Sequence, residues 1–462
     1  MDVPPDPGQW AEATFGSADL GDPRRTRRLV AAAARIAAHP TKAFTQVFDW
    51  NELRGFYRLC HQAEATLAAV AGPHWDQTRR AMAEYPVVLV LHDTTELDYS
   101  THPALTGLGQ IGNERGRGLL QHNSLAVLPG PRRVLGLAYQ QLVAREPAPA
   151  GESVYWRKRR QRESDLWANG FRAAGRPPAA CRWVDVCDRG ADDYEALRAS
   201  LGAGHEFLVR VAQNRRVFVT PGHDRQAYAL DYARSLAAAA ADTVEIPGRG
   251  GRPTRTAGVR LAAAPVWLPA PAGTPQRRSQ PALPAWVVRV WEPDPPAGVD
   301  EPLEWVLWSS VPTATAEELK ARRDWYACRP LVERYHDILK NGCGAEDRRF
   351  ETADRMETCL AVLAVVAVRV FQMRCALDHE PAAPAEAAGT AAEVDVIRRL
   401  VGHPGGAYTV RDFVRGVATL GGFLGRARDG EPGVRALWKG YQRLQDMLLG
   451  LRLLQPDADD SG

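Results

Sequence analysis

Three acidic side chains that lie far apart in the sequence are the strongest candidates for chemistry. Asp93 and Asp188 each follow a run of apolar, strand-forming residues, at positions 87–91 and 183–187. Glu333 lies in a later segment whose apolar residues have helical spacing. Because open α/β sheets build their sites at strand ends, we expect the three carboxylates to meet there. Acids from two strands and a helix suit a divalent metal ion, so the sequence predicts that all three are catalytic and metal-binding residues.

Each acid taken singly has a more ordinary interpretation. An Asp after a strand is more often a turn or capping residue than a catalytic one. Glu333 lies between Arg329 and Lys340 on a helical segment, which is typical of solvent-exposed ion pairs. The combination of three such acids with basic clusters elsewhere favours a site for phosphoryl transfer. It would hold two Mg²⁺ ions, with Mn²⁺ as a substitute.

The segment 326–340 positions the third acid. At 100° per residue, Tyr326, Arg329, Glu333 and Lys340 project from nearly the same side of a helix. Pro330 disfavours helical geometry in the residue before it, so the segment is predicted to form one helix or two short ones.

The surrounding chain predicts an α/β protein with three parts. Residues 1–85 have helical periodicity throughout, and residues 86–378 alternate strands and helices. Within the second part, residues 215–310 are rich in Pro, Gly and short β-like runs, with no helix-length periodic segment, and are predicted to form a β-rich insertion. Residues 379–462 begin with an Ala/Pro/Glu linker at 380–392. They continue with expected helices at 394–401, 410–420 and 434–454.

The overall charge does not indicate a nucleic-acid partner, but local clusters of basic residues do. The 462 residues include 58 Lys plus Arg and 55 Asp plus Glu, a net charge of only +3. Residues 20–42 nevertheless hold six basic side chains, and residues 155–162 hold five. Asp22 and Pro23 are expected to begin a helix inside the first cluster, and the backbone N–H groups at the start of this helix add an anion site. A solvated basic helix face is the alternative for both clusters.

Several classes of protein are not indicated. The seven cysteines are odd in number and no two of them form a C-x-x-C pair, so the sequence indicates neither a disulfide framework nor a zinc motif. The N-terminus lacks the basic and apolar regions of a secretory signal. Arg369 and Arg374 are expected to interrupt the apolar run at 360–371 before it reaches membrane-spanning length. A soluble, cytoplasmic protein without a membrane partner is predicted.

The motifs resemble those of the DDE transposases of the insertion-sequence-four family. The spacing Tyr326, two residues, Arg329, three residues, Glu333, six residues, Lys340 reproduces that family's Y-(2)-R-(3)-E-(6)-K signature. The settings Asp93-Thr94-Thr95 and Cys187-Asp188-Arg189 match those of its first two acids. The segment 20–26 matches its N-terminal DNA-binding region, and residues 421–423 and 437–438 resemble its C-terminal dimerisation region.

The resemblance implies an RNase H-like catalytic core with a β-rich insertion, a helical N-terminal DNA-binding domain and a helical C-terminal dimerisation domain. It implies a homodimer that pairs inverted-repeat transposon ends, nicks double-stranded DNA, forms and opens a hairpin, and transfers the strand to target DNA. The DNA-contacting residues that it implies are Arg24, Arg25, Arg27, Arg28, Lys42, Arg210, Trp305, Tyr326, Arg329 and Lys340. Another RNase H-like nuclease, or a DNA-binding regulator that no longer cuts, remain alternatives.

Overall fold

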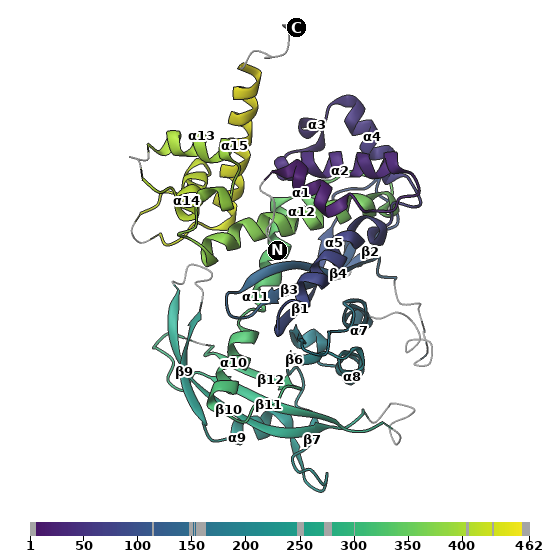
Figure 1. Cartoon of the computed structure of the whole chain (residues 1–462). Helices are drawn as coiled ribbons and strands as arrows, with labels where there is room; N and C mark the ends of the chain where they lie inside the picture. Colours follow the sequence, from purple (N-terminus) through teal and green to yellow (C-terminus); the bar gives the residue numbers. More distant parts are fainter. Residues whose placement is uncertain are drawn as a thin grey trace.

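Helical regions lie at one end of the molecule and a β-rich region at the other (Figure 1). The computed structural model describes residues 6–112, 115–146, 151, 153, 163–246, 254–271, 280–299, 301–402, 406–426 and 429–454. The basic cluster at 155–162 lies outside these residues, as does much of the two loops expected at 248–255 and 269–284.

The N-terminal region is helical, as the sequence predicted. Its helices are α1 (Pro7–Phe15), α2 (Pro23–Ala38), α3 (Phe44–Val47), α4 (Trp50–Cys60) and α5 (Leu67–Met82). The Asp22 carboxylate accepts a hydrogen bond from the backbone N–H of Arg24 at 2.8 Å, and Pro23 occupies the first turn of α2. The expected start of this helix is therefore confirmed.

The central sheet combines antiparallel and parallel strands. Its first strands are β1 (Val87–Asp98), β2 (Gly109–Ile111), β3 (Gly116–Leu128), β4 (Arg133–Val143), β5 (Arg182–Cys187) and β6 (Glu206–Arg210). In space the order is β4–β3–β1–β5–β6, and β2 pairs with the start of β3. The pairs β4–β3 and β3–β1 are antiparallel, whereas β1–β5 and β5–β6 are parallel.

One expectation about β1 is wrong. The sequence placed Asp93 at the end of a strand, but β1 continues to Asp98. The parallel pairing with β5 stops at Leu91, while the antiparallel pairing with β3 extends from Leu89 to Asp98. Asp93 therefore lies inside β1, at the point where its β5 neighbour ends.

Helices cover both faces of this sheet. The helix α7 (Glu163–Ala173), the 3-10 turn η1 (Arg189–Ala191) and α8 (Tyr194–Ala203) lie along one face. The helices α11 (Pro330–Asp337) and α12 (Ala353–His379) pack on the other, and α5 lies against β4 with residues in the clusters of both faces. Side chains of a strand alternate between faces, so Leu89 and Leu91 face α11 and α12, whereas Val88 and Val90 face the opposite side.

The predicted β-rich insertion extends the same sheet. It contains β7 (Arg216–Phe218), β8 (Gln226–Tyr228), α9 (Ala229–Ser235), β9 (Ala240–Ile246), β10 (Arg255–Leu268), β11 (Leu283–Trp291) and β12 (Glu304–Ser309). The strand β12 pairs with β6 and so joins the insertion to the central strands. Two details differ from expectation. Residues 229–235 form the short helix α9, and two of the short β-like runs of the sequence, at 256–261 and 266–268, are parts of the single strand β10.

The segment that carries Glu333 is broken twice. The helix α10 (Ala316–Tyr326) ends before Arg329, α11 begins at Pro330, and the π-helical turn η2 (Ile338–Gly342) follows. The expected break at Pro330 is confirmed, although Arg329 itself keeps helical angles (φ −52°, ψ −39°). The 100° spacing therefore does not hold from Tyr326 to Lys340, because the helix restarts at Pro330 and is wider at η2.

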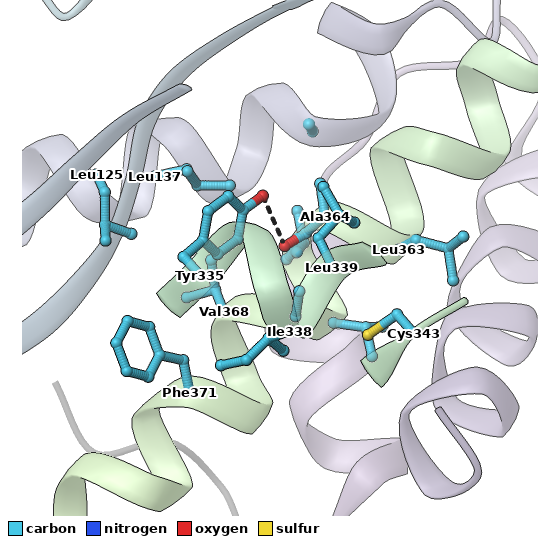
Figure 2. Packing of buried hydrophobic residues seen from close by; sticks show 14 of the residues in the cluster. Leu125, Leu137, Tyr335, Ile338, Leu339, Cys343, Leu363, Ala364, Val368 and Phe371 are labelled. Carbon is cyan, nitrogen blue, oxygen red and sulfur yellow. Dashed lines mark hydrogen bonds between the residues drawn. The ribbon is translucent and has the colours of Figure 1, made fainter. Parts of the chain in front are cut away.

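Apolar packing fixes α11 and η2 against the core (Figure 2). Tyr335, Ile338 and Leu339 are fully buried and belong to one cluster with residues of α12 and of the sheet. The Tyr335 hydroxyl also donates to the Ala364 carbonyl of α12 at 3.4 Å. The main chain that carries Glu333 is thus held by both the sheet and α12.

The apolar run in the core helix α12 is longer than the sequence suggested. Residues 353–375 are long and apolar enough to cross a membrane by length and composition, so the expectation that Arg369 and Arg374 interrupt the run too early is wrong. In the structure 78% of an apolar 18-residue stretch of this helix is buried inside the protein. Core helices of soluble proteins meet the same criterion.

The C-terminal region contains η4 (Ala385–Ala387), α13 (Ala391–Val401), α14 (Val410–Leu420) and α15 (Val434–Leu454). The expected helices at 410–420 and 434–454 are confirmed. The expected linker at 380–392 is partly folded, because Ala385 N–H donates to the Tyr408 carbonyl and Thr390 caps α13. The helix α15 also contacts η2, where Trp438 covers Gly342.

This contact predicts the effect of a small substitution. A Cβ on Gly342 would lie 2.3 Å from a Trp438 ring atom, so Gly342→Ala should destabilise the protein by about 1 to 3 kcal/mol. The control is Gly202→Ala in α8, where a Cβ would meet nothing within 4 Å. Thermal unfolding of both variants tests the prediction. Equal midpoints would show that α15 does not pack on η2 in solution.

Candidate active site

Strand periodicity brings two of the predicted acids together. Asp93 has the same side-chain orientation as Leu91, and Asp188 follows Val186 by two residues, so both point to the face covered by α11. Leu91 and Val186 are partners in the parallel β1–β5 register. Two residues further along each chain, Asp93 and Asp188 are therefore neighbours.

A single arginine contacts all three predicted acids. Nη2 of Arg329 lies 3.1 Å from Oδ2 of Asp93 and 3.1 Å from Oδ2 of Asp188. The other terminal nitrogen, Nη1, forms an ion pair with Oε1 of Glu333. The Asp93 and Arg329 side chains are 13% exposed, whereas those of Asp188 and Glu333 are 38% and 56% exposed. The cluster is therefore closed at Asp93 and open to solvent at Glu333.

Backbone donors help to orient the two aspartates. Oδ1 of Asp93 accepts a hydrogen bond from Thr94 N–H at 3.0 Å, and Oδ1 of Asp188 accepts one from Gly190 N–H at 2.7 Å. In both residues the other oxygen, Oδ2, is the atom that faces Arg329. Glu333 lies in the first turn of α11, where the helix dipole favours a negative charge.

Burial changes the protonation of two groups here. It raises the pKa of Asp93 to about 6; the negative charge of Asp188 adds to this shift and Arg329 opposes it. It lowers the pKa of His336 to about 3, with Arg329 and Lys340 contributing in the same direction. Near neutral pH, His336 is therefore uncharged and Asp93 is largely ionised.

The acids fit a divalent metal by chemistry but not in their present arrangement. Among the described residues, no three His, Cys, Asp or Glu side chains are grouped so that they could hold a metal ion. The Arg329 guanidinium lies between the carboxylates instead, with at least one oxygen of each facing it. Carboxylate oxygens that converge on one positive group are the donor set that Mg²⁺ prefers. Metal binding at this position requires Arg329 to move away.

A second group of predicted residues lies beside the acids. Arg210 ends β6, Trp305 lies in β12 and Tyr326 ends α10. The rings of Trp305 and Tyr326 meet edge to face, with centroids 5.1 Å apart. Burial raises the pKa of Tyr326, and the positive charges of Arg210 and Arg329 oppose this shift. The insertion thus delivers Trp305 to the site through β12.

Other predicted DNA contacts have protein partners in the structure. Lys340 donates to the Glu96 carbonyl at 2.8 Å and pairs with Glu346 at 3.1 Å. Lys42 pairs with Asp446 of α15. Arg25 donates to the Leu20 carbonyl at 2.8 Å and also holds Gln62 and Glu64. These contacts fix local structure, and the role of these residues in binding DNA stays a prediction.

The remaining predicted arginines of α2, which are Arg24, Arg27 and Arg28, are exposed. Sequence reasoning missed a face that adjoins them. On α4, Trp50, Arg54 and Arg58 are exposed at a spacing of four residues, and Trp50 is 70% exposed. The spacing itself was a readable signal, because residues four apart lie on one side of a helix.

Comparison with known protein families assigns the two ends of the chain. Residues 7–65 match the family described as Transposase DNA-binding, and residues 396–459 match the family described as Transposase Tn5 dimerisation domain. The two matches indicate a transposase. They cover about a quarter of the 462 residues and support a Tn5-like DNA-processing enzyme that binds DNA and forms homodimers. The exposed faces of α2 and α4 lie within the first match, and α14 and α15 lie within the second.

The raised pKa of Asp93 predicts a pH-dependent stability. The Asp93 carboxyl binds its proton more tightly in the folded chain than an ordinary Asp does, whose pKa is 3.8, so protonation favours folding. The contribution of Asp93 protonation to the free energy of unfolding is complete below about pH 4 and is lost as the pH rises to about 6. In metal-free buffer, the stability of Asp93→Asn relative to wild type should rise across that range by up to about 3 kcal/mol.

The control variant is Asp22→Asn, because Arg24 lowers the pKa of Asp22 to about 2. The contribution of Asp22 is lost only at lower pH, so its variant should show no such rise. Chemical denaturation at pH 4, 5, 6 and 7 with a chelator present measures both effects. A constant difference between Asp93→Asn and wild type would contradict the burial argument.

Proposed function

We propose that this chain is a DDE transposase of the insertion-sequence-four type that cuts and joins DNA by Mg²⁺-dependent phosphoryl transfer. Its substrates are double-stranded inverted-repeat transposon ends and target DNA, which it handles as a homodimer in the cytoplasm. The observation that carries the proposal is the convergence of Asp93, Asp188 and Glu333 on Arg329. Arg329 and Glu333 belong to the Y-R-E-K signature, and Asp93 and Asp188 stand in the D-T-T and C-D-R settings.

The arrangement of the sheet supports an RNase H-like core. Three antiparallel strands, β4, β3 and β1, continue into the parallel strands β5 and β6. Asp93 lies in β1, the first strand of the chain, and Asp188 directly follows β5. If the short strand β2 is left out, β5 is the fourth strand of the chain. The proposed catalytic domain spans residues 86–378, between an N-terminal DNA-binding domain at 1–85 and a dimerisation region at 379–462.

The side chains have separate tasks in the proposed mechanism. Asp93, Asp188 and Glu333 would hold two Mg²⁺ ions, or Mn²⁺ in their place. The bound metal supplies activation of the attacking oxygen and charge stabilisation at the leaving oxygen, for nicking, hairpin formation and opening, and strand transfer. Tyr326, Arg329 and Lys340 hold phosphates of the transposon end, and Trp305 lies beside a flipped base. Arg329, which contacts the three carboxylates here, would contact a phosphate instead when they hold metal.

Removing one acid tests the catalytic assignment. Wild type and Asp188→Asn are incubated with Mg²⁺ and duplexes carrying the inverted repeats that flank the gene. The variant should release cleaved ends more than about 100-fold more slowly, because a metal ligand is lost, and should still shift the DNA in a gel. Asp354→Asn, on the exposed start of α12, is the control. Equal cleavage by Asp188→Asn and wild type would refute the assignment, whereas wild type that binds but never cuts would indicate a DNA-binding regulator.

The Arg329 contacts predict a second, opposite effect. Without DNA, Arg329→Ala should bind Mn²⁺ about 10-fold or more tightly than wild type, because the competing positive group is gone. Arg334→Ala removes the same charge from an exposed position on α11 and should change the affinity less than twofold. Electron paramagnetic resonance of free Mn²⁺ measures both. Equal affinities of Arg329→Ala and wild type would show that Arg329 does not occupy a metal position.

A further inference from the structure

A row of polar side chains crosses the sheet beneath α11. Asp93 of β1 is the cross-strand partner of Asn123 in β3, and Asn123 is the partner of Gln140 in β4. Asn123 and Gln140 are 0% and 1% exposed. Two residues along, the row formed by Leu91 and Leu125 is apolar. Polar groups this deeply buried require hydrogen-bond partners, so their arrangement is a specific feature of the site.

His336 of α11 connects this row to the predicted metal ligand. Its Nε2 lies 3.0 Å from Nδ2 of Asn123, and its Nδ1 lies 3.7 Å from Oδ2 of Asp93. His336 is only 7% exposed. It follows Glu333 by three residues, so both side chains project from the same side of α11.

The hydrogen bonds of Asn123 determine which nitrogen of His336 carries the proton. Nδ2 of Asn123 also donates to the backbone carbonyl of Gln121 at 3.3 Å, and a carbonyl can only accept. Oδ1 of Asn123 accepts from Nε2 of Gln121 at 3.1 Å and from Nε2 of Gln140 at 2.9 Å. The amide therefore presents its NH₂ group to His336, so Nε2 of His336 accepts. The proton of the neutral ring lies on Nδ1, facing Asp93.

We propose that His336, with its tautomer set by Asn123, positions the Asp93 carboxylate for metal binding. This inference rests on the proposed function. At 3.7 Å the Nδ1–H group is beyond hydrogen-bond distance while Oδ2 of Asp93 is held by Arg329 at 3.1 Å. When Arg329 leaves, Nδ1–H is the donor aimed at Oδ2, and Thr94 N–H already holds Oδ1. Two donors then fix the plane of the carboxylate and leave its remaining lone pairs for metal.

Three variants separate the donor at Nδ1 from the bulk of the ring. Asn places its amide nitrogen near the position of Nδ1, Gln places it near the position of Nε2, and Leu retains the volume without a donor. In the complex with the inverted-repeat duplex, His336→Leu and His336→Gln should weaken Mn²⁺ binding about 10- to 100-fold, the usual effect of removing a partner of a metal ligand. His336→Asn should remain within about threefold of wild type. Electron paramagnetic resonance gives the binding constants, and thermal unfolding confirms that each variant is folded.

Cleavage kinetics and a double variant complete the experiment. The Mn²⁺ concentration for half-maximal cleavage should rise in His336→Leu while the rate at saturating Mn²⁺ changes less. Asn123→Leu should weaken Mn²⁺ binding in wild type but have no further effect in His336→Leu, because both changes break one chain of contacts. The inference is wrong if Leu, Gln and Asn at 336 bind Mn²⁺ equally, or if the two sites are additive. If Asp93→Asn also leaves Mn²⁺ binding unchanged, the proposed function fails instead.

Discussion

The attraction between one guanidinium and three carboxylates organises the site. Asp93, Asp188 and Glu333 carry three formal negative charges, and Arg329 supplies one positive charge against them. Close carboxylates repel one another, and burial adds to the cost of ionising Asp93. Arg329 reduces this repulsion without cancelling it. The cluster therefore favours additional positive charge, and a divalent ion provides more charge in a smaller volume than a guanidinium does.

The polar row below α11 shows how a buried site is kept specific. An unsatisfied amide in the core would cost about 1 to 3 kcal/mol, but Asn123 uses both its NH₂ and its carbonyl oxygen. The same amide contacts β3 itself, β4 and α11. A sliding of α11 along the sheet would break the contact between Asn123 and His336, so the polar row and the apolar cluster of Figure 2 fix the same helix in different ways.

Local periodicity was sufficient to predict much of the site. The alternation of side chains along β1 and β5 is readable in the sequence, and so are the helical spacing around Glu333 and the break at Pro330. Asp93 was misplaced at a strand end because the pairing that prolongs β1 is supplied by β3, about 30 residues further along the chain. For the same reason Ala262, Ala263 and Ala264, which are poor strand formers alone, lie inside β10 through pairing with β11.

Contacts between elements could not be predicted in the same way. Charge alone does not distinguish Arg329, which contacts three acids before the start of α11, from Arg334, which is exposed on α11. His336 acquires its partners from strands more than 200 residues earlier in the chain. Such contacts depend on the tertiary arrangement, which the sequence resemblance indicates only for residues that belong to a known motif.

The position of Arg329 explains how the site could change its occupant without refolding. Its side chain leaves the backbone at the break between α10 and α11, one residue before the helix that carries Glu333. The main chain of α11 is held by α12 through Tyr335 and by β3 through His336. The Glu333 side chain remains 56% exposed. In the proposed function, exchange of Arg329 for metal would therefore involve rotation of two side chains, Arg329 and Glu333, about a backbone that neighbouring elements hold.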